Sequence, residues 1–325
     1  MRLPTFYSRM PDFPRGFHWF NAKPMTKTAL LGKVVLIDFF TLSCATCERG
    51  RSWVDAWRAR YGRRGLVTIG IHVPEFAFER SDAYIESMLK ERGITFPVVH
   101  DGKYILWNAY KNRIRPGRYV VDAQGKIVYR GDDGDGVDTE RAIRDALRAA
   151  GKHLPELPEQ RINEESCHRL SPDVHLGYLH GSLGNADDLL PAVESAFTDN
   201  GVYKDDVPYL HGHWRVTKEF VEHARSLPVA TEYLAIRYSA FALHAVLESS
   251  TLMTVEVRLD EQPVPESMRG DALVLDGEKT VMQIGEARIY EIIRSSAYHR
   301  GTLKFLVASA GLRCYVISTE NCQTG

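Results

Sequence analysis

The stretch VVLIDFFTLSCATCERGRSW, residues 34–53, places Cys44 and Cys47 just after an apolar run. Apart from Asp38 the run is apolar, which is typical of a strand covered on both faces of a sheet. A helical pattern follows from Cys44 to about Tyr61. The sequence therefore predicts a buried strand that leads into a helix, with the cysteine pair at the start of the helix.

A thiol at a helix start has a defined chemistry. Backbone N–H groups and the helix dipole stabilise an anion there, so the thiolate of Cys44 is favoured and becomes a nucleophile. Cys47, one turn later, can attack the resulting mixed disulfide and release the substrate. Two interpretations compete: part of a zinc site completed by Cys167 and His168, or inert core thiols. A structural zinc site usually needs a second cysteine pair, and the sequence has none. Inert core thiols would not account for the position of both cysteines at the start of a helix.

The overall composition sets broad limits. A chain of 325 residues predicts two domains, and 44% hydrophobic with 26% charged residues is typical of a globular protein. A net charge of −1 argues against nucleic acid and anionic lipid as partners. The five cysteines are too few for a disulfide scaffold. The first residues lack the apolar segment of a signal peptide, so the sequence predicts a cytoplasmic location.

The first half alternates strands and helices. Further apolar runs at 66–73 and 96–101 predict strands, and 118–131 predicts a hairpin. Predicted helices cover Glu79 to Glu91, Tyr104 to Asn112, and a last segment from Asp138 or Thr139 to Ala150. This order predicts an α/β domain over residues 1–152, followed by a polar linker with prolines over residues 153–172.

The second half has a different period. Residues 252–260, LMTVEVRLD, alternate apolar with polar side chains, and residues 302–308 and 311–319 continue the pattern. Short alternating strands between Gly, Pro and Asp turns predict a mostly antiparallel β-sandwich over residues 173–325. Residues 185–226 are ambiguous and are compatible with a helix.

A resemblance to a known family becomes specific at this point. VVLIDFFTLSCATCERG followed by TIGIHVPEFAFE resembles the TlpA-like branch of the thioredoxin superfamily. It is similar to the extracytoplasmic part of CcdA-type fusion proteins, a thioredoxin-like domain followed by a jelly-roll-like, carbohydrate-binding-module-like domain. The resemblance covers residues 16–150 and, with a weaker pattern, 170–320. It implies a thioredoxin fold and a location outside the cytoplasm, contrary to the prediction from the chain start.

The resemblance also implies an activity. It predicts a thiol–disulfide oxidoreductase that exchanges electrons between Cys44–Cys47 and protein disulfides or dithiols, with no organic cofactor and no metal. A CcdA-type membrane electron carrier is the implied partner. Many relatives have Trp before the first cysteine, where this chain has Ser43, and the intervening pair is Ala45-Thr46 without the usual Pro. Because that dipeptide tunes the redox potential, the direction of electron flow stays open.

Four more residues follow from the resemblance. Asp38 lies six residues before Cys44, where many thioredoxins keep a buried acid that takes the proton of the second cysteine. Pro116 matches the family's cis-proline, which shapes the edge where substrate chains pair. Arg115 is expected near the thiolate of Cys44 or on the surface. Glu75 either relays protons or caps the next helix.

Two alternative functions remain. Thr41, three residues before Cys44, fits part of the peroxidase pattern of the same fold, but Ile37 stands where that pattern has Pro. The carboxy-terminal domain could instead bind a carbohydrate through aromatic rings, although such rings are more often core. The candidate rings are Trp214, Tyr178, Tyr203, Tyr209, Tyr233 and Tyr238.

Some motifs carry less weight. The H-x-H of His211 and His213 is a weak metal signal, and GDDGDGVD at 131–138 lacks the register of a calcium loop. The spacing of Cys314 and Cys322 does not by itself establish a disulfide.

Overall fold

The computed structural model describes residues 9–131, 136–155, 173–186 and 190–321. The chain divides into two compact units, Met1–Ile162 and Asn163–Gly325. Of the predicted linker, 153–172, residues 156–172 lie outside the described ranges, so the domain limits at 152 and 173 stay predictions. Each unit is described by itself.

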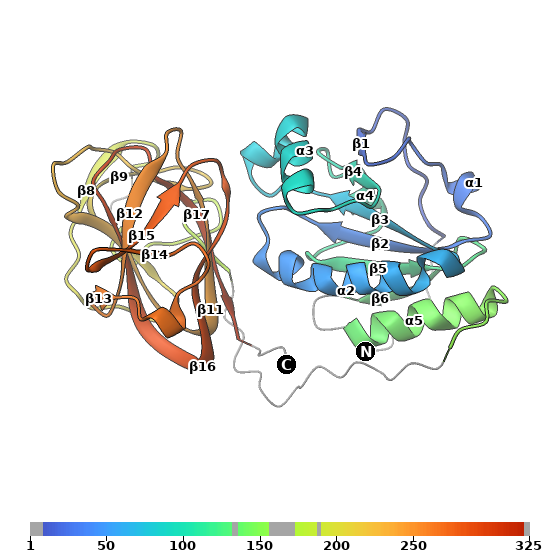
Figure 1. Cartoon of the computed structure of the whole chain (residues 1–325). Helices are drawn as coiled ribbons and strands as arrows, with labels where there is room; N and C mark the ends of the chain where they lie inside the picture. The colour runs from blue at the N-terminus through green and yellow to red at the C-terminus, as the bar shows by residue number, and fades with distance from the viewer. Residues whose placement is uncertain (1–8, 132–135, 156–172, 187–189, 322–325) are drawn as a thin grey trace. The chain divides into compact units, whose positions relative to one another are not determined.

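The first unit is built on a six-stranded mixed sheet in the order β1-β4-β3-β2-β5-β6 (Figure 1). β2 pairs in parallel with β3, and β3 with β4, whereas β1, β5 and β6 run antiparallel to their neighbours. The strands are β1 (Trp19–Phe20), β2 (Val34–Phe40), β3 (Leu66–His72), β4 (Val98–His100), β5 (Gly117–Val121) and β6 (Ile127–Gly131). The predicted buried strands and hairpin are confirmed.

Helices flank this sheet (Figure 1). They are α1 (Lys27–Leu30), α2 (Ala45–Tyr61), α3 (Asp82–Glu91), α4 (Ile105–Ala109) and α5 (Gly136–Ala149), with 3-10 turns at Gly62–Arg64 and Ala77–Arg80. The predicted α/β class is confirmed. The helix expected from Glu79 begins later, because Ser81 accepts the hydrogen bond that starts α3 and Glu79 belongs to the preceding 3-10 turn.

β2 is buried along its whole length and separates two apolar layers. Val35, Ile37 and Phe39 join the cluster that also contains Leu106 and Tyr110. Side chains alternate along a strand, so Asp38 points to the opposite face. Thus the acid of the apolar run lies on the side of the sheet that faces α2.

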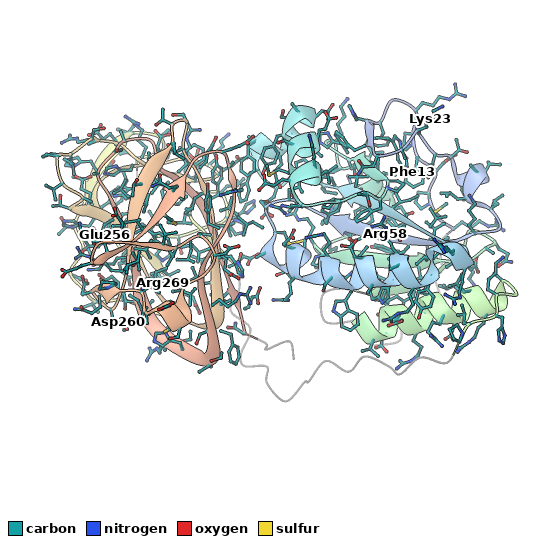
Figure 2. All side chains as sticks on the ribbon, in the orientation of Figure 1. Phe13, Lys23, Arg58, Glu256, Asp260 and Arg269 are labelled. Carbon is teal, nitrogen blue, oxygen red and sulfur yellow. A yellow bond between two sulfur atoms is a disulfide. The ribbon has the colours of Figure 1, made fainter. Side chains whose placement is uncertain are left out.

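Close packing around the sheet depends on particular small and aromatic residues. A Cβ atom on Gly70 of β3 would lie 2.8 Å from the rings of Phe40 and Phe96, so this position requires glycine. Phe13, labelled in Figure 2, packs edge-on against Trp19 with ring centroids 5.0 Å apart. These contacts fix the strands on which the site residues stand.

The second unit is β-rich, and its ladders between named strands are antiparallel, as predicted. Two long strands, β11 (Glu232–Glu248) and β16 (Arg288–Val307), pair along most of their length. The remaining strands are β7 (Val174–His175), β8 (Glu194–Phe197), β9 (Pro208–Val216), β10 (Val221–His223), β12 (Met253–Leu259), β13 (Gln262–Pro263), β14 (Val274–Asp276), β15 (Lys279–Ile284) and β17 (Arg313–Glu320).

The structure settles the ambiguous segment 185–226. Residues 187–189 lie outside the described ranges, and the described part of the segment contains β8, β9 and β10 and no helix, so the helical alternative is wrong for the described part. Trp214 and Val216 of β9 and Val221 of β10 are buried in one cluster with β11 and β17. From Trp214 to Val216 and from Val221 to His223, buried residues alternate with partly exposed ones, as in strands. Among the described residues, no helix is both long and apolar enough to cross a membrane.

Candidate active site

Cys44 and Cys47 form a disulfide at the N-terminus of α2, with Cα atoms 5.2 Å apart. Cys44 is the N-cap residue: its backbone is extended, and its Sγ accepts a hydrogen bond from the N–H of Cys47 at 3.0 Å. Cys44 is half-buried, whereas only 7% of Cys47 is exposed. The outer sulfur therefore meets a substrate first, and the inner one is protected from solvent.

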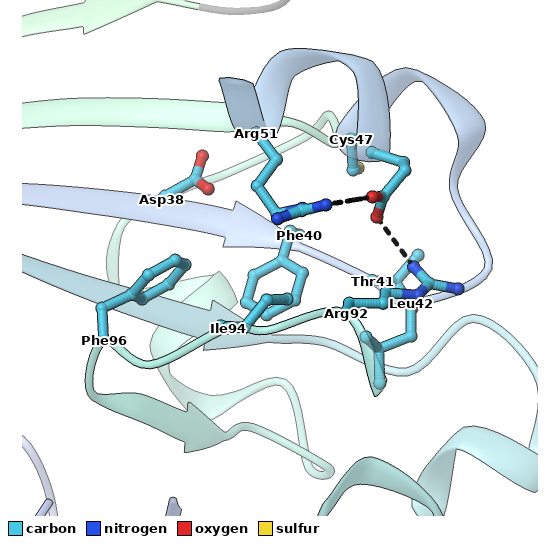
Figure 3. A pocket seen from close by; sticks show the side chains of 10 residues that line it. Asp38, Phe40, Thr41, Leu42, Cys47, Arg51, Arg92, Ile94 and Phe96 are labelled. Atoms are coloured by element: carbon cyan, nitrogen blue, oxygen red, sulfur yellow. Dashed lines mark hydrogen bonds and ion pairs between the residues drawn. The ribbon is translucent and has the colours of Figure 1, made fainter. Parts of the chain in front are cut away.

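Asp38 lies beneath this pair. It is 6% exposed and lines a cavity of about 10 Å³ together with Cys47, Phe40 and Leu42 (Figure 3). That volume is close to the space that one water molecule requires. Asp38 Oδ1 has no hydrogen-bond partner among the described residues, although a guanidinium lies nearby. The cavity thus connects a buried carboxylate with the inner cysteine.

The guanidinium belongs to Arg118, a residue that the sequence alone did not point to. Arg118 of β5 is the direct cross-strand partner of Asp38, and its Nε lies 3.5 Å from Asp38 Oδ1. Arg118 is 1% exposed. Burial raises the pKa of Asp38, and although Arg118 opposes this effect, the pKa stays above its ordinary value. A carboxyl with a raised pKa is suited to take and return a proton near neutral pH.

The predicted proline is at the start of β5. The Arg115–Pro116 peptide bond is cis, as the resemblance implied. Arg115 Nη2 lies 3.1 Å from Glu75 Oε2, and its guanidinium stands over the ring of Trp107 at 5.5 Å. Its polar contacts in the described part of the chain are with Glu75 and a backbone carbonyl, so its expected effect on the Cys44 thiolate stays a prediction.

Glu75 follows β3, as predicted. Its carboxylate forms the ion pair with Arg115, and the side chain that caps α3 is Ser81. The helix-capping alternative for Glu75 is therefore wrong, and a relay of protons through it stays a prediction.

Glu79 is a second site residue that the sequence alone did not point to, and it lies at the centre of a buried network. Its Oε1 accepts hydrogen bonds from the Thr41 hydroxyl at 2.5 Å and from the Ser43 N–H at 2.8 Å. Its Oε2 accepts from the N–H groups of Glu75 at 2.7 Å and Phe76 at 3.1 Å. One carboxylate therefore joins the loop before Cys44 to the loop after β3.

The charge of Glu79 is held inside the protein. Burial alone raises the pKa of Glu79, but the nearby His72 and the hydrogen bonds that its carboxylate accepts lower it to about 2. His72 Nε2 lies 3.8 Å from Glu79 Oε1, and burial lowers the pKa of this histidine. The Thr41 hydroxyl donates to Glu79 and so supports the structure of the loop. This contact differs from the role in peroxide reduction that the spacing of Thr41 and Cys44 suggested.

The mouth of the cavity is charged. Glu48 accepts hydrogen bonds from Arg51 at 2.6 and 3.1 Å and from Arg92 at 3.1 Å (Figure 3). Arg51 also bonds Asp55 at 3.3 Å. Arg51 of α2 is thus paired with acids of the same helix. The surface beside the dithiol therefore carries both positive and negative side chains.

The described residues of the other predicted motifs form no metal site. Within the described ranges, no group of three His, Cys, Asp or Glu residues is arranged to hold a metal ion. His213 lies 3.1 Å and His223 2.8 Å from the carboxylate of Glu232, whereas His211 stacks on Tyr233. Residues 132–135 of the calcium-like stretch lie outside the described residues.

The remaining cysteines and aromatic rings are also placed. Cys314 is buried and free, whereas Cys167, His168 and Cys322 lie outside the described residues. Three of the rings proposed for sugar stacking are at most 5% exposed, which removes them from any sugar platform: Trp214, Tyr209 and Tyr238. The others, Tyr178, Tyr203 and Tyr233, are more exposed, and a sugar site on them stays a prediction.

Comparison with known proteins agrees with this geometry. Residues 9–130 match the model of the AhpC/TSA family, and residues 171–318 match the model described as "Thioredoxin like C-terminal domain". The first unit is a thioredoxin-like domain. The fold predicted for the first domain and the β-rich second part are both confirmed.

Curated relatives of this chain include redox proteins. "Protein DipZ" of Mycobacterium tuberculosis (strain CDC 1551 / Oshkosh) is 35% identical over 175 residues, which are 51% of this chain and 25% of that protein. "Thiol-disulfide oxidoreductase YkuV" of Bacillus subtilis (strain 168) is 28% identical over 129 residues, 39% of this chain and 86% of that protein. The chain therefore spans about a quarter of the length of the DipZ proteins that it matches.

Proposed function

We propose that this chain is a thiol–disulfide oxidoreductase that exchanges electrons between Cys44–Cys47 and disulfides of other proteins. The observation that carries the proposal is the disulfide at the N-terminus of α2, with a buried carboxyl beneath it on the wall of a water-sized cavity. Its similarity to a protein named a thiol–disulfide oxidoreductase supports the same activity.

The reduced protein starts the exchange. The Cys44 thiolate attacks one sulfur of a substrate disulfide, and the other substrate sulfur leaves as a thiolate and takes a proton from solvent. Cys47 then gives its proton to Asp38 through the cavity and attacks Cys44 Sγ. The second substrate sulfur leaves and is protonated. The substrate has gained two electrons and two protons, and Cys44–Cys47 has become the disulfide seen in the structure.

Substrate binding is assigned to the surface around Pro116. The cis-proline precedes β5, and beside it the Arg115–Glu75 ion pair and Trp107 form a mixed apolar and charged surface. We propose that an extended segment of the substrate pairs along the backbone before Pro116, next to the half-buried Cys44. Glu75 and Arg115 then help to select the partner by charge.

The electron donor is proposed from the resemblance. A CcdA-type membrane carrier is the proposed dithiol partner of Cys44–Cys47, and a location outside the cytoplasm is proposed with it. Similarity to DipZ over a quarter of that protein's length supports both proposals. Reduction of the purified chain by such a carrier in proteoliposomes tests the partner, and failure of electrons to pass contradicts it.

The activity itself is tested by reduction of insulin with dithiothreitol. We expect Cys44→Ser to abolish catalysis and Cys47→Ser to accumulate a mixed disulfide on Cys44. Cys314→Ser is the matched control, because Cys314 is buried in the second unit and should leave the rate unchanged. Equal rates for wild type and both active-site variants contradict the proposal.

One alternative has a direct assay of its own. Consumption of hydrogen peroxide by the reduced protein, faster than by free thiol, favours the peroxidase hypothesis for Cys44. We expect no such acceleration, since Thr41 is bonded to Glu79. The midpoint potential of Cys44–Cys47 then fixes the direction of electron flow.

A further inference from the structure

We propose that Arg118 is a positioning residue for the exchange: it holds Asp38 against helix α2 and controls how readily Asp38 accepts the proton of Cys47. The inference rests on the proposed function, because it concerns the proton step of that reaction. Among the described residues, Arg118 interacts with Asp38 and with Gly50 and Trp57 of α2, so it acts on the sulfurs through the acid and the helix and not by direct contact.

The geometry places Arg118 between the acid and the helix of the dithiol. Its Nε faces Asp38 Oδ1 at 3.5 Å, and its Nη2 donates to the carbonyl oxygen of Gly50 at 2.9 Å. Gly50 lies in the first turns of α2, shortly after Cys47. The guanidinium also lies over the ring of Trp57 of the same helix at 5.5 Å. One side chain thus joins the proton acceptor to the element that carries both cysteines.

Stability alone does not explain an arginine at this position. A buried ion pair stabilises a fold no better than apolar residues of similar volume, because both charges lose their hydration. Arg118 is among the largest fully buried side chains of the described residues. Guanidinium groups present a planar set of donors that suits a buried carboxylate, whereas a lysine ammonium does not. A constant positive charge beside a titrating acid has a clear use in a proton transfer.

The charges around Asp38 determine whether its pKa rises or falls when Arg118 is replaced. Burial raises the pKa of Asp38, Arg118 lowers it, and Asp55 of α2 raises it by a smaller amount. The other charged groups on the cavity wall are Glu48, Arg51 and Arg92, and both arginines donate hydrogen bonds to Glu48. Without Arg118, the desolvated carboxyl keeps its proton to a higher pH and cannot receive the proton of Cys47 there.

The test uses the full reduced chain and 5,5′-dithiobis(2-nitrobenzoate). Every protein compared carries Cys167→Ser and Cys322→Ser, and Cys314 is buried. Attack by Cys44 then releases the first coloured thiolate, and attack by Cys47 on the mixed disulfide releases the second. The pH dependence of the second phase is compared between wild type, Arg118→Met and Arg118→Lys. Carbon-13 NMR follows the carboxyl of Asp38 directly in the same proteins.

We expect Arg118→Met to move the titration of Asp38 and the second phase to higher pH together. A tenfold higher proton affinity of Asp38 slows the second phase about tenfold at a fixed pH below the midpoint. Arg118→Lys keeps the positive charge, so the titration of Asp38 and the second phase should both move to higher pH by a smaller amount. The first phase, attack by Cys44, should keep its pH dependence, which separates this effect from a general disturbance of the fold.

Asp38→Asn alone leaves the buried guanidinium unpaired and is prone to unfold, so Asp38→Asn/Arg118→Met is the reference protein. Its second phase should lose the component of the pH dependence that follows the titration of Asp38 and keep the component set by ionisation of the Cys47 thiol. An unchanged Asp38 titration in Arg118→Met overturns the inference and leaves the insulin result of Cys44→Ser intact. A titration that moves while the second phase does not follow overturns the proton role of Asp38 and the inference with it.

Discussion

At the scale of single residues, Glu79 carries a negative charge in the interior of the first unit. Its side chain is completely buried, and its carboxylate accepts bonds from one hydroxyl and three backbone N–H groups. A folded-state pKa of about 2, below the ordinary 4.5, means that the folded protein prefers the ionised form. The negative charge of Glu79 therefore belongs to the structure of the active-site loop.

This assignment predicts how acid changes stability. The contribution of Glu79 is fully present above pH 4.5 and is lost as the pH falls towards 2. Glu79→Gln should lower the free energy of unfolding by roughly 3 kcal/mol at pH 7, and by much less near pH 2. Urea denaturation at several pH values measures the difference.

The control for that series is Glu86→Gln, on the exposed side of α3. It should change the free energy of unfolding by less than about 0.5 kcal/mol at every pH. A cost of Glu79→Gln that stays constant from pH 7 to pH 2 would show that the charge of Glu79 is not responsible.

The residues that could be predicted are those whose chemistry is local in sequence. Cys44 and Cys47 are close together, and the apolar run that precedes them already implies the burial of Asp38. Arg118 and Glu79 could not be predicted, because each meets its partner through strand pairing or a loop from elsewhere in the chain. Only the register between β2 and β5 brings Arg118 opposite Asp38.

At the scale of elements, the sulfur of Cys44 caps the N-terminus of α2. Because this sulfur accepts the Cys47 N–H, it satisfies one of the donors that every helix N-terminus leaves open. Serine is a good N-cap residue and alanine is a poor one. In the reduced protein, Cys44→Ala should therefore cost about 1 kcal/mol more than Cys44→Ser.

Thermal unfolding of the two variants under reducing conditions measures this difference, and neither variant can form the disulfide. Ser81→Ala provides a comparison, because Ser81 caps α3 in the same way, by accepting the N–H of Tyr84. Equal stability of Cys44→Ala and Cys44→Ser would show that the sulfur does not support the helix.

The elements that the sequence predicted well are those with a clear period. Continuous apolar runs identified β2 and β3, and alternation identified β12 and β17. The start of α3 was misplaced because the residues after Pro74 favour a helical turn, and only tertiary contacts show that Glu79 is turned inward. Short strands such as β10 carry too few residues to display a period.

At the scale of the whole molecule, each unit has its own hydrophobic cluster, and the two clusters share no residue. The Cys44–Cys47 disulfide lies within the first unit and closes a short loop. Calorimetry should therefore show two unfolding transitions. Reduction of Cys44–Cys47 should destabilise only the first unit, by about 2 kcal/mol in the free energy of unfolding, because the unfolded chain gains entropy when the loop opens.

Cys314→Ala is the matched change in the other unit, since it opens a space in the cluster of the second unit. Cys314→Ala should lower the unfolding temperature of the second unit, which reduction of Cys44–Cys47 leaves unchanged. A single transition that responds to both changes would contradict independent unfolding of the units.

The long pairing of β11 with β16 has a consequence for how the chain reaches its native state. The ladder joins residues as distant in sequence as Glu232 and Val307, so much of the intervening chain must be ordered before its ends gain contacts. In the first unit, β2 and β3 are linked by a single helix. Folding rates fall as contacting residues become more distant in sequence. β2 also pairs with β5, and this pairing joins residues as distant in sequence as Val35 and Val121. Both halves therefore contain slow long-range pairings, and only the β2–β3 part of the half that carries the dithiol is expected to form early.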